Sequence, residues 1–183
     1  MAVHEQRYRL SLGGALGLTI GLLSAGSSCG DPVRDELVKS LGPEKAGVPP
    51  GPMHRPNQPC LACHDEEGGE EPLLSVGGTI YQDPISTIPV GDVAVSIFDS
   101  MGRSFVATTN CAGNFMVRSS EFAPAYPIWL ELDAGKIHRS MDTASFREGS
   151  CAACHADPAG GTSAGHVYII DDPMDPPPPN PCQ

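Results

Sequence analysis

The pentapeptide Cys-x-x-Cys-His occurs twice in this chain, at residues 60–64 and 151–155. Two cysteines at this spacing can form thioether bonds to one porphyrin, and the histidine that follows can bind its iron. Four of the seven cysteines fall inside these two copies, which argues against a chance occurrence. The sequence therefore predicts two covalently attached haem c groups, with the thioethers on Cys60, Cys63, Cys151 and Cys154 and the proximal iron ligands His64 and His155.

Pairs of cysteines at this spacing also occur in zinc sites, where two pairs can supply four thiolates. In this chain the pairs are 91 residues apart, counted from Cys60 to Cys151, which is much longer than the usual gap between the halves of a zinc ribbon. Zinc also does not require a histidine directly after each pair. The pattern favours haem, and a zinc-stapled β-sandwich that binds at the cell surface is the alternative.

The first 28 residues have the pattern of a secretory signal peptide. Arg7 and Arg9 precede an apolar run at 10–23, which is followed by small residues at 24–28. The run is short for a membrane span and contains several glycines, so we expect cleavage. We therefore predict an exported protein, located at the outer membrane, in the periplasm or on the cell surface.

Cys29 follows this segment and resembles the lipidated cysteine of a bacterial lipoprotein signal. Gly26 stands where such signals usually carry an aliphatic residue. The resemblance implies a lipid anchor on Cys29, and an ordinary signal peptidase site near Ser28 is the alternative.

The predicted mature chain is strongly acidic. Removing Glu5, Arg7 and Arg9 with the signal peptide leaves nine Lys plus Arg and 21 Asp plus Glu, a balance of −12. This charge argues against binding of nucleic acid, and it favours basic redox partner proteins. The same charge could serve solubility alone.

The rest of the chain divides by composition. Residues 29–59 are rich in proline and predict a mobile tether, with a short helix near 35–40 at most. Between the haem segments, short β-rich runs separated by turn residues predict a small antiparallel sandwich at 75–141. The expected strands are 76–81, 93–98, 104–109, 115–117 and 128–132, with Val93, Val95 and Ile97 facing the core. The fold class is thus mainly β, flanked by loop-rich haem attachment segments at 60–74 and 142–170 and ending in a proline-rich tail at 171–183.

Three blocks, 78–81, 91–97 and 108–115, resemble the carboxypeptidase regulatory-like domain, a transthyretin-like β-sandwich. This resemblance implies architecture and no catalysis. The order of signal, haem motif, sandwich and second haem motif is similar to a group of small bacterial dihaem cytochrome c-like lipoproteins. That resemblance implies membrane-tethered electron transfer outside the cytoplasm.

Several histidines and methionines could supply the sixth iron ligands. Our first choices are His54 for one haem and Met141 for the other, because each precedes a motif closely. His138 lies three residues before Met141 on an expected strand, so the two should point to opposite faces. His166 could return beside a haem on a final strand. Each of these side chains could equally be core filler or an exposed loop residue.

An electron carrier fits the sequence better than an enzyme. The chain shows no evident distal acid-base pair, phosphate-binding loop or Ser/His/Asp arrangement. A five-coordinate haem that senses a ligand or acts as a peroxidase is a further alternative. The two remaining cysteines, Cys111 and Cys182, could form a disulfide in an oxidising compartment or remain free thiols.

Overall fold

The computed structural model of this chain describes residues 31–44, 46–48 and 50–182. The predicted signal peptide and the lipidation of Cys29 lie outside the described residues. Within the described residues, no helix is both long enough and apolar enough to cross a membrane.

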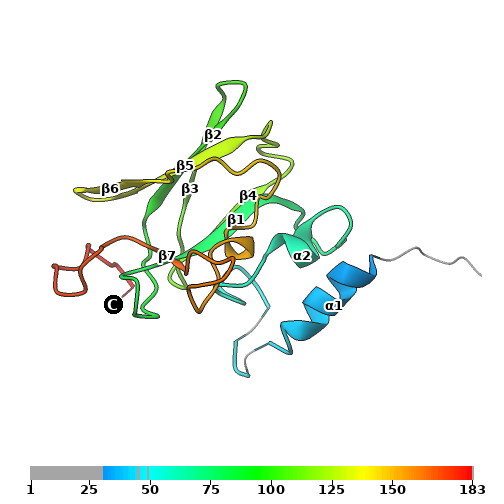
Figure 1. The fold of residues 1–183 in the computed structure, drawn as a ribbon, viewed down its shortest axis with the longest axis horizontal. Helices are drawn as coiled ribbons and strands as arrows, with labels where there is room; N and C mark the ends of the chain where they lie inside the picture. Colours follow the sequence, from blue (N-terminus) through cyan, green and yellow to red (C-terminus); the bar gives the residue numbers. More distant parts are fainter. Residues whose placement is uncertain (1–30, 45, 49, 183) are drawn as a thin grey trace, which may run out of the picture. The chain divides into compact units, whose positions relative to one another are not determined.

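The described part of the chain is mainly β, as the sequence predicts, and forms two sheets (Figure 1). One sheet has the order β4-β1-β7 and contains β1 (Leu74–Tyr81), β4 (Asn114–Arg118) and β7 (Val167–Tyr168). The other has the order β3-β2-β5-β6 and contains β2 (Ala94–Asp99), β3 (Ser104–Thr108), β5 (Ile128–Ala134) and β6 (Ile137–Ser140). All strand pairs are antiparallel except β1 with β7, which is parallel.

The core lies between the two sheets. It consists of the residues that face inward, which alternate with outward-facing residues along the strands. Val93, Val95 and Ile97 are fully buried, which confirms the predicted alternation along the second strand. Phe115 and Val117 of β4 and Ile80 of β1 pack in the same cluster. β7 adds Val167, and the residues that follow it add Ile169 and Ile170, so the segment after the second motif also contributes to the core.

The turn from β2 to β3 is organised by the buried carboxylate of Asp99. Its Oδ1 accepts hydrogen bonds from the backbone N–H groups of Met101 (3.0 Å) and Arg103 (2.8 Å). Its Oδ2 accepts from Arg103 Nε (2.8 Å) and from the N–H of Ala125 (3.1 Å). Burial opposes ionisation, but these hydrogen bonds together hold the pKa of Asp99 at about 2, below its ordinary value of 3.8.

We expect Asp99→Asn to lower the free energy of unfolding at pH 7 and to have a smaller effect in acid. A depressed pKa in the folded state contributes stability above pH 4, and this contribution is lost as the pH falls through 2. Urea unfolding of both proteins at pH 7 and pH 3 measures the two differences, with the exposed Asp142→Asn as control. Equal differences at the two pH values would contradict this role of Asp99.

The C-terminal tail is joined to the sandwich by a disulfide between Cys111 and Cys182, whose Cα atoms lie 5.4 Å apart. Of the two arrangements that the sequence left open, the structure therefore has the bonded one. Asn180 adds a second connection, because its side-chain Nδ2 donates to the carbonyl of Pro89 (2.9 Å). The tail is thus fixed next to the 89–91 segment and the turn that contains Cys111.

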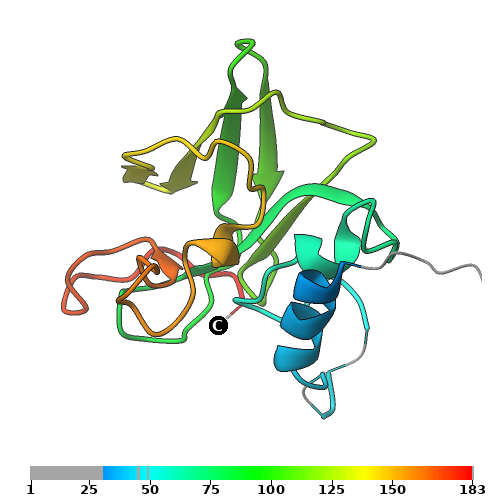
Figure 2. The same ribbon diagram turned by 45° about the vertical axis from the view of Figure 1, so that its right-hand side comes forward.

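Helix α1 (Pro32–Ser40) begins at Asp31, whose side chain accepts a hydrogen bond from the N–H of Val33 (2.9 Å). From this helix, Arg34 Nε donates to the carbonyl of Ala62 (2.6 Å), and its Nη1 donates to the carbonyl of Glu67 (3.0 Å). Figure 2 shows α1 beside the first motif. Helix α1, which belongs to the predicted tether, therefore contacts this motif.

Candidate functional site

Each of the two Cys-x-x-Cys-His motifs forms a short helical turn that is closed by the same backbone hydrogen bond, from the histidine to the first cysteine. In the first, which includes α2 (Leu61–His64), the N–H of His64 donates to the carbonyl of Cys60 (3.0 Å). In the second, which includes the 3₁₀ turn η1 (Cys151–Ala153), the N–H of His155 donates to the carbonyl of Cys151 (2.8 Å). Positions three and four apart in such a turn lie on one face. In the second motif, Cys151, Cys154 and His155 line one pocket.

In both motif histidines, Nδ1 has the same kind of hydrogen-bond partner, a backbone carbonyl oxygen. His64 Nδ1 lies 3.0 Å from the carbonyl oxygen of Glu70, and His155 Nδ1 lies 3.1 Å from the carbonyl oxygen of Gly165. A carbonyl oxygen can only accept, so Nδ1 carries the hydrogen and Nε2 of the neutral ring has a free lone pair. This is the tautomer, and the kind of supporting hydrogen bond, that metal-ligating histidines use.

The first cysteine of each motif packs against the same strand, at neighbouring glycines of β1. A Cβ atom at Gly77 would lie 3.3 Å from Cys60 Sγ, and one at Gly78 would lie 2.7 Å from Cys151 Sγ. Because neighbouring Cα atoms are about 3.8 Å apart, the two sulfur atoms are separated by at most roughly 13 Å. Because consecutive residues of a strand point to opposite faces, the two cysteines contact opposite faces of β1. Two motifs that are far apart in the sequence thus lie beside one strand, as the positions of α2 and η1 in Figures 1 and 2 also show.

A second set of contacts holds the segment before the second motif next to β1 and close to the first motif. The segment before the second motif runs beside β1, where the N–H of Gly77 donates to the carbonyl of Gly149 (3.0 Å) and Ser150 forms a parallel bridge with Gly77. A Cβ atom at Gly149 would clash with the carbonyl oxygen of Ser75 and would lie 3.1 Å from Leu61 Cδ2. Leu61 belongs to the first motif, so the approach to the second motif requires a glycine beside the first.

The four motif cysteines are free thiols, in contrast to the disulfide of the tail. Burial raises the pKa of Cys60, and burial together with the nearby thiol of Cys60 raises the pKa of Cys151 to about 12. Both first cysteines are therefore neutral thiols at physiological pH. Among the four thiols, Cys154 is exposed, and Cys60, Cys63 and Cys151 are partly buried.

His54, the first choice for one sixth ligand, lies beside the histidine of the first motif. The ring centroids of His54 and His64 are 5.8 Å apart, with 34° between the ring planes. The carbonyl of His54 accepts a hydrogen bond from Asn114 Nδ2 (3.0 Å), so β4 holds this segment in place. His54 Nδ1 accepts from the N–H of Gly51 at 3.3 Å, which puts the hydrogen of the neutral ring on Nε2. Iron ligation through Nε2 requires this contact to be given up.

The backbone between His54 and the first motif is unusual. Arg55 and Asn57 both have positive φ angles, 49° and 59°, which non-glycine residues adopt rarely and often at functional sites. The N–H of Asn57 donates to Thr79 Oγ1 (2.7 Å), which fixes this conformation against β1.

Met141, the first choice for the other sixth ligand, lines a pocket of about 110 Å³ that it shares with Cys151, Cys154 and His155. Small-molecule sites usually occupy roughly 300 to 1,000 Å³. The pocket lies below this range, so it could hold the donor atoms next to an iron and would not enclose a whole haem. With this limit, the donor set of the second motif fits the predicted group.

The other two histidines do not face the motif thiols in this way. His138 lies exposed on β6, where its Nδ1 is 2.9 Å from Asp133 Oδ1, and this hydrogen bond raises its pKa. His166 is buried, and both of its ring nitrogens have oxygen partners. Because both of its ring nitrogens already have partners, His166 has none to offer to an iron.

Within residues 31–44, 46–48 and 50–182, no three or more His, Cys, Asp or Glu side chains gather as a metal site. No protein-family model, curated protein or solved structure matches this chain.

Gly77 and Gly78 of β1 are positions of the candidate site that motif analysis did not identify. The signal was present, because two consecutive glycines inside a strand pattern often mark a close approach of another part of the chain. The sequence did not indicate that both motifs make this approach.

Proposed function

We propose that this protein is a dihaem c-type electron carrier that works outside the cytoplasm. The observation that carries the proposal is the convergence of two equivalent motif turns on Gly77 and Gly78 of β1. Each turn has free thiols and a histidine whose Nδ1 is bound to a backbone carbonyl. A zinc site does not require that each motif has its own histidine with the same hydrogen bond at Nδ1.

In this proposal, each of the two haems has its own cysteines and its own iron ligands. When bound, each haem iron would accept one electron from a reduced partner protein and release it to an oxidised one. Cys60 and Cys63 would hold one group and Cys151 and Cys154 the other, while His64 and His155 would supply the proximal nitrogen ligands. Met141 and His54 would complete the two ligand sets. A thioether and an imidazole as sixth ligands give different potentials, so the two groups would form a directional pair.

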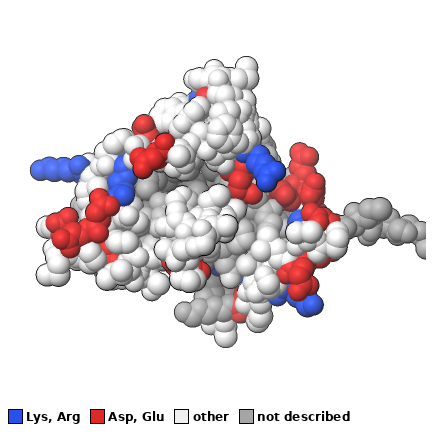
Figure 3. All heavy atoms as spheres, in the orientation of Figure 1, with Lys and Arg blue, Asp and Glu red and all other residues white. Residues whose placement is uncertain are grey.

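The charge of the surface supports a basic partner. Glu66, Glu67, Glu70 and Glu71 are exposed on the loop that directly follows His64. Figure 3 shows acidic side chains over the side of the described structure that carries α1 and α2. Such a field would speed the encounter with a basic protein near the first haem, and salt would weaken it. The predicted lipid on Cys29 would keep this encounter at a membrane.

Counting haems in motif variants tests the proposal. The protein is co-expressed with a cytochrome c maturation system, together with Cys60→Ser/Cys63→Ser and Cys151→Ser/Cys154→Ser. We expect peptide mass spectrometry to find haem on both motifs of the parent and on only the intact motif of each variant. Haem-free parent protein that binds zinc would overturn the proposal in favour of the zinc-stapled module.

A further inference from the structure

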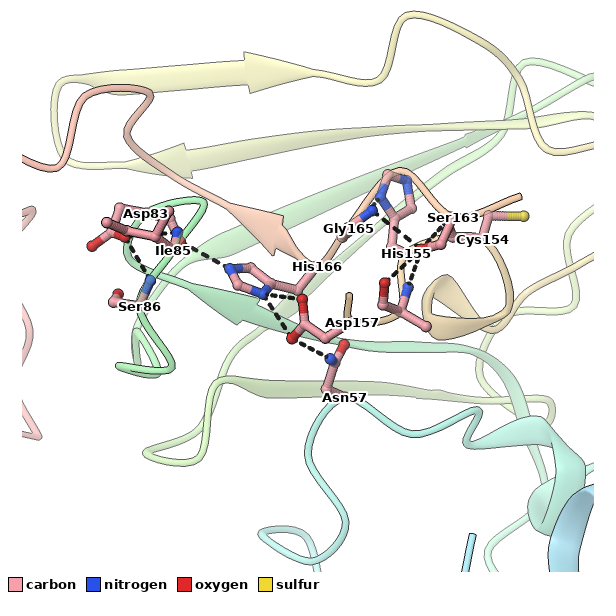
Figure 4. Close-up of polar contacts among 11 residues, drawn as sticks. Asn57, Asp83, Ile85, Ser86, Cys154, His155, Asp157, Ser163, Gly165 and His166 are labelled. Atoms are coloured by element: carbon pink, nitrogen blue, oxygen red, sulfur yellow. Dashed lines mark hydrogen bonds and ion pairs between the residues drawn. The ribbon is translucent and has the colours of Figure 1, made fainter. Parts of the chain in front are cut away.

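We propose that His166 is a positioning residue for the second haem, which holds the hydrogen-bond partner of His155 in place. The inference rests on the proposed function and adds to it a role for a histidine that is not an iron ligand. Figure 4 shows the side chains and backbone groups that surround His166.

His166 is only 5% exposed and is held on both sides. Its Nδ1 lies 2.8 Å from both carboxylate oxygens of Asp157, and its Nε2 lies 2.9 Å from the carbonyl oxygen of Asp83. The ring also packs against Tyr81 of β1, with 4.7 Å between the ring centroids. Each ring nitrogen therefore lies within hydrogen-bond distance of an oxygen atom, and the ring is held from two sides.

The partners of His166 are themselves fixed. Asp157 Oδ2 also accepts a hydrogen bond from Asn57 Nδ2 (3.0 Å), which belongs to the segment before the first motif. Asp83 Oδ1 accepts from the N–H groups of Ile85 (3.0 Å) and Ser86 (2.7 Å), which closes a turn around the Asp83 carbonyl. His166 is therefore clamped between a turn of the sandwich and a carboxylate two residues beyond His155.

The link from His166 to His155 runs through one peptide group. The carbonyl oxygen of Gly165 accepts from His155 Nδ1 (3.1 Å). This carbonyl lies in the plane of the peptide bond between Gly165 and His166, and that plane includes the Cα atom of His166. A fixed His166 thus restricts the direction of the acceptor that faces His155. Gly165 has a φ of 81°, so the chain can make this bend because position 165 is a glycine.

The first motif has no such clamp among its described contacts. The acceptor of His64 is the carbonyl of Glu70, and both residues of that peptide, Glu70 and Glu71, are exposed. The two proximal histidines therefore share one kind of hydrogen bond but differ in how firmly the acceptor is held.

Holding the acceptor has a chemical consequence at the iron. A hydrogen bond from Nδ1 makes the imidazole a more basic ligand, which favours the oxidised iron. Loosening the Gly165 carbonyl weakens this bond, so the midpoint potential of the second haem should rise. The first haem should keep its potential.

Spectroelectrochemical titration of the holoprotein tests the assignment. We expect His166→Ala and His166→Gln to shift the midpoint potential of the second haem to a more positive value and to leave that of the first unchanged. The Cys60→Ser/Cys63→Ser background, which leaves only the second haem, identifies which potential has moved. His138→Gln is the matched control, because His138 also bonds a carboxylate but lies exposed on β6.

The outcomes are distinguishable from a failure of the proposed function. Haem content is measured first, and a parent protein without haem refutes the carrier. If a folded, doubly loaded His166 variant keeps both potentials, or if both potentials shift equally, His166 has no positioning role. If His166→Ala does not fold, the size-conserving His166→Gln decides by the same criteria.

Discussion

Replacing Met141 by alanine is expected to open the iron of the second haem to carbon monoxide. Met141 lines the pocket formed with Cys151, Cys154 and His155, so its thioether is the sixth ligand that the structure offers there. Its loss should change this iron from six-coordinate low spin to five-coordinate high spin and lower its midpoint potential. Titration of the reduced protein with carbon monoxide should show about half of the total haem binding the gas, because only one of the two predicted haems is affected.

The control for this prediction is Met101→Ala, because Met101 is 74% exposed in the turn between β2 and β3. This variant should bind no more carbon monoxide than the parent. A Met141→Ala protein that behaves like the parent would show that Met141 is core filler. A parent that itself binds carbon monoxide at the second haem would favour the ligand-sensing alternative.

The close approach of the motifs leads to a second large expected effect, electronic coupling between the haems. The sulfur atoms of Cys60 and Cys151 lie within roughly 13 Å of each other, because they contact neighbouring residues of one strand. Haems attached through these two sulfur atoms would have Soret transitions near enough to couple, which gives a circular dichroism band with a positive and a negative lobe. We expect this two-lobed band in the protein with both haems.

Single-motif variants provide the matched control for the coupling. Cys60→Ser/Cys63→Ser and Cys151→Ser/Cys154→Ser should each give a Soret band of single sign. The sum of these two spectra should differ from the spectrum of the parent. A parent spectrum equal to that sum would contradict the close placement of the two haems.

The strands could be predicted from the sequence because their pattern is local. Alternation of buried and exposed residues, as at Val93, Val95 and Ile97, follows from strand geometry and needs no knowledge of the rest of the chain. The parallel pairing of β7 with β1 could not be predicted, because its partners Ile80 and Val167 are far apart in the sequence, with the other strands of the sandwich between them. The bonding of Cys111 to Cys182 depends on the same kind of long-range placement.

In the candidate site too, the local pattern could be predicted from the sequence and the long-range placement could not. The motif turns follow from the spacing of cysteine and histidine, which is a local pattern. Their convergence on Gly77 and Gly78 depends on where the sandwich directs two distant segments. His166 shows the limit most clearly, because in the sequence it is one more histidine near a motif. Its role as an anchor becomes visible only through Asp83 and Asp157, which bind both of its nitrogens.

The measurement that tests the central claim most directly is a pyridine haemochrome spectrum, combined with the intact mass, of protein co-expressed with a cytochrome c maturation system. The proposal predicts a c-type spectrum and a mass increase equal to two haems. Protein without haem, produced while the maturation system is active on a control cytochrome, would contradict it.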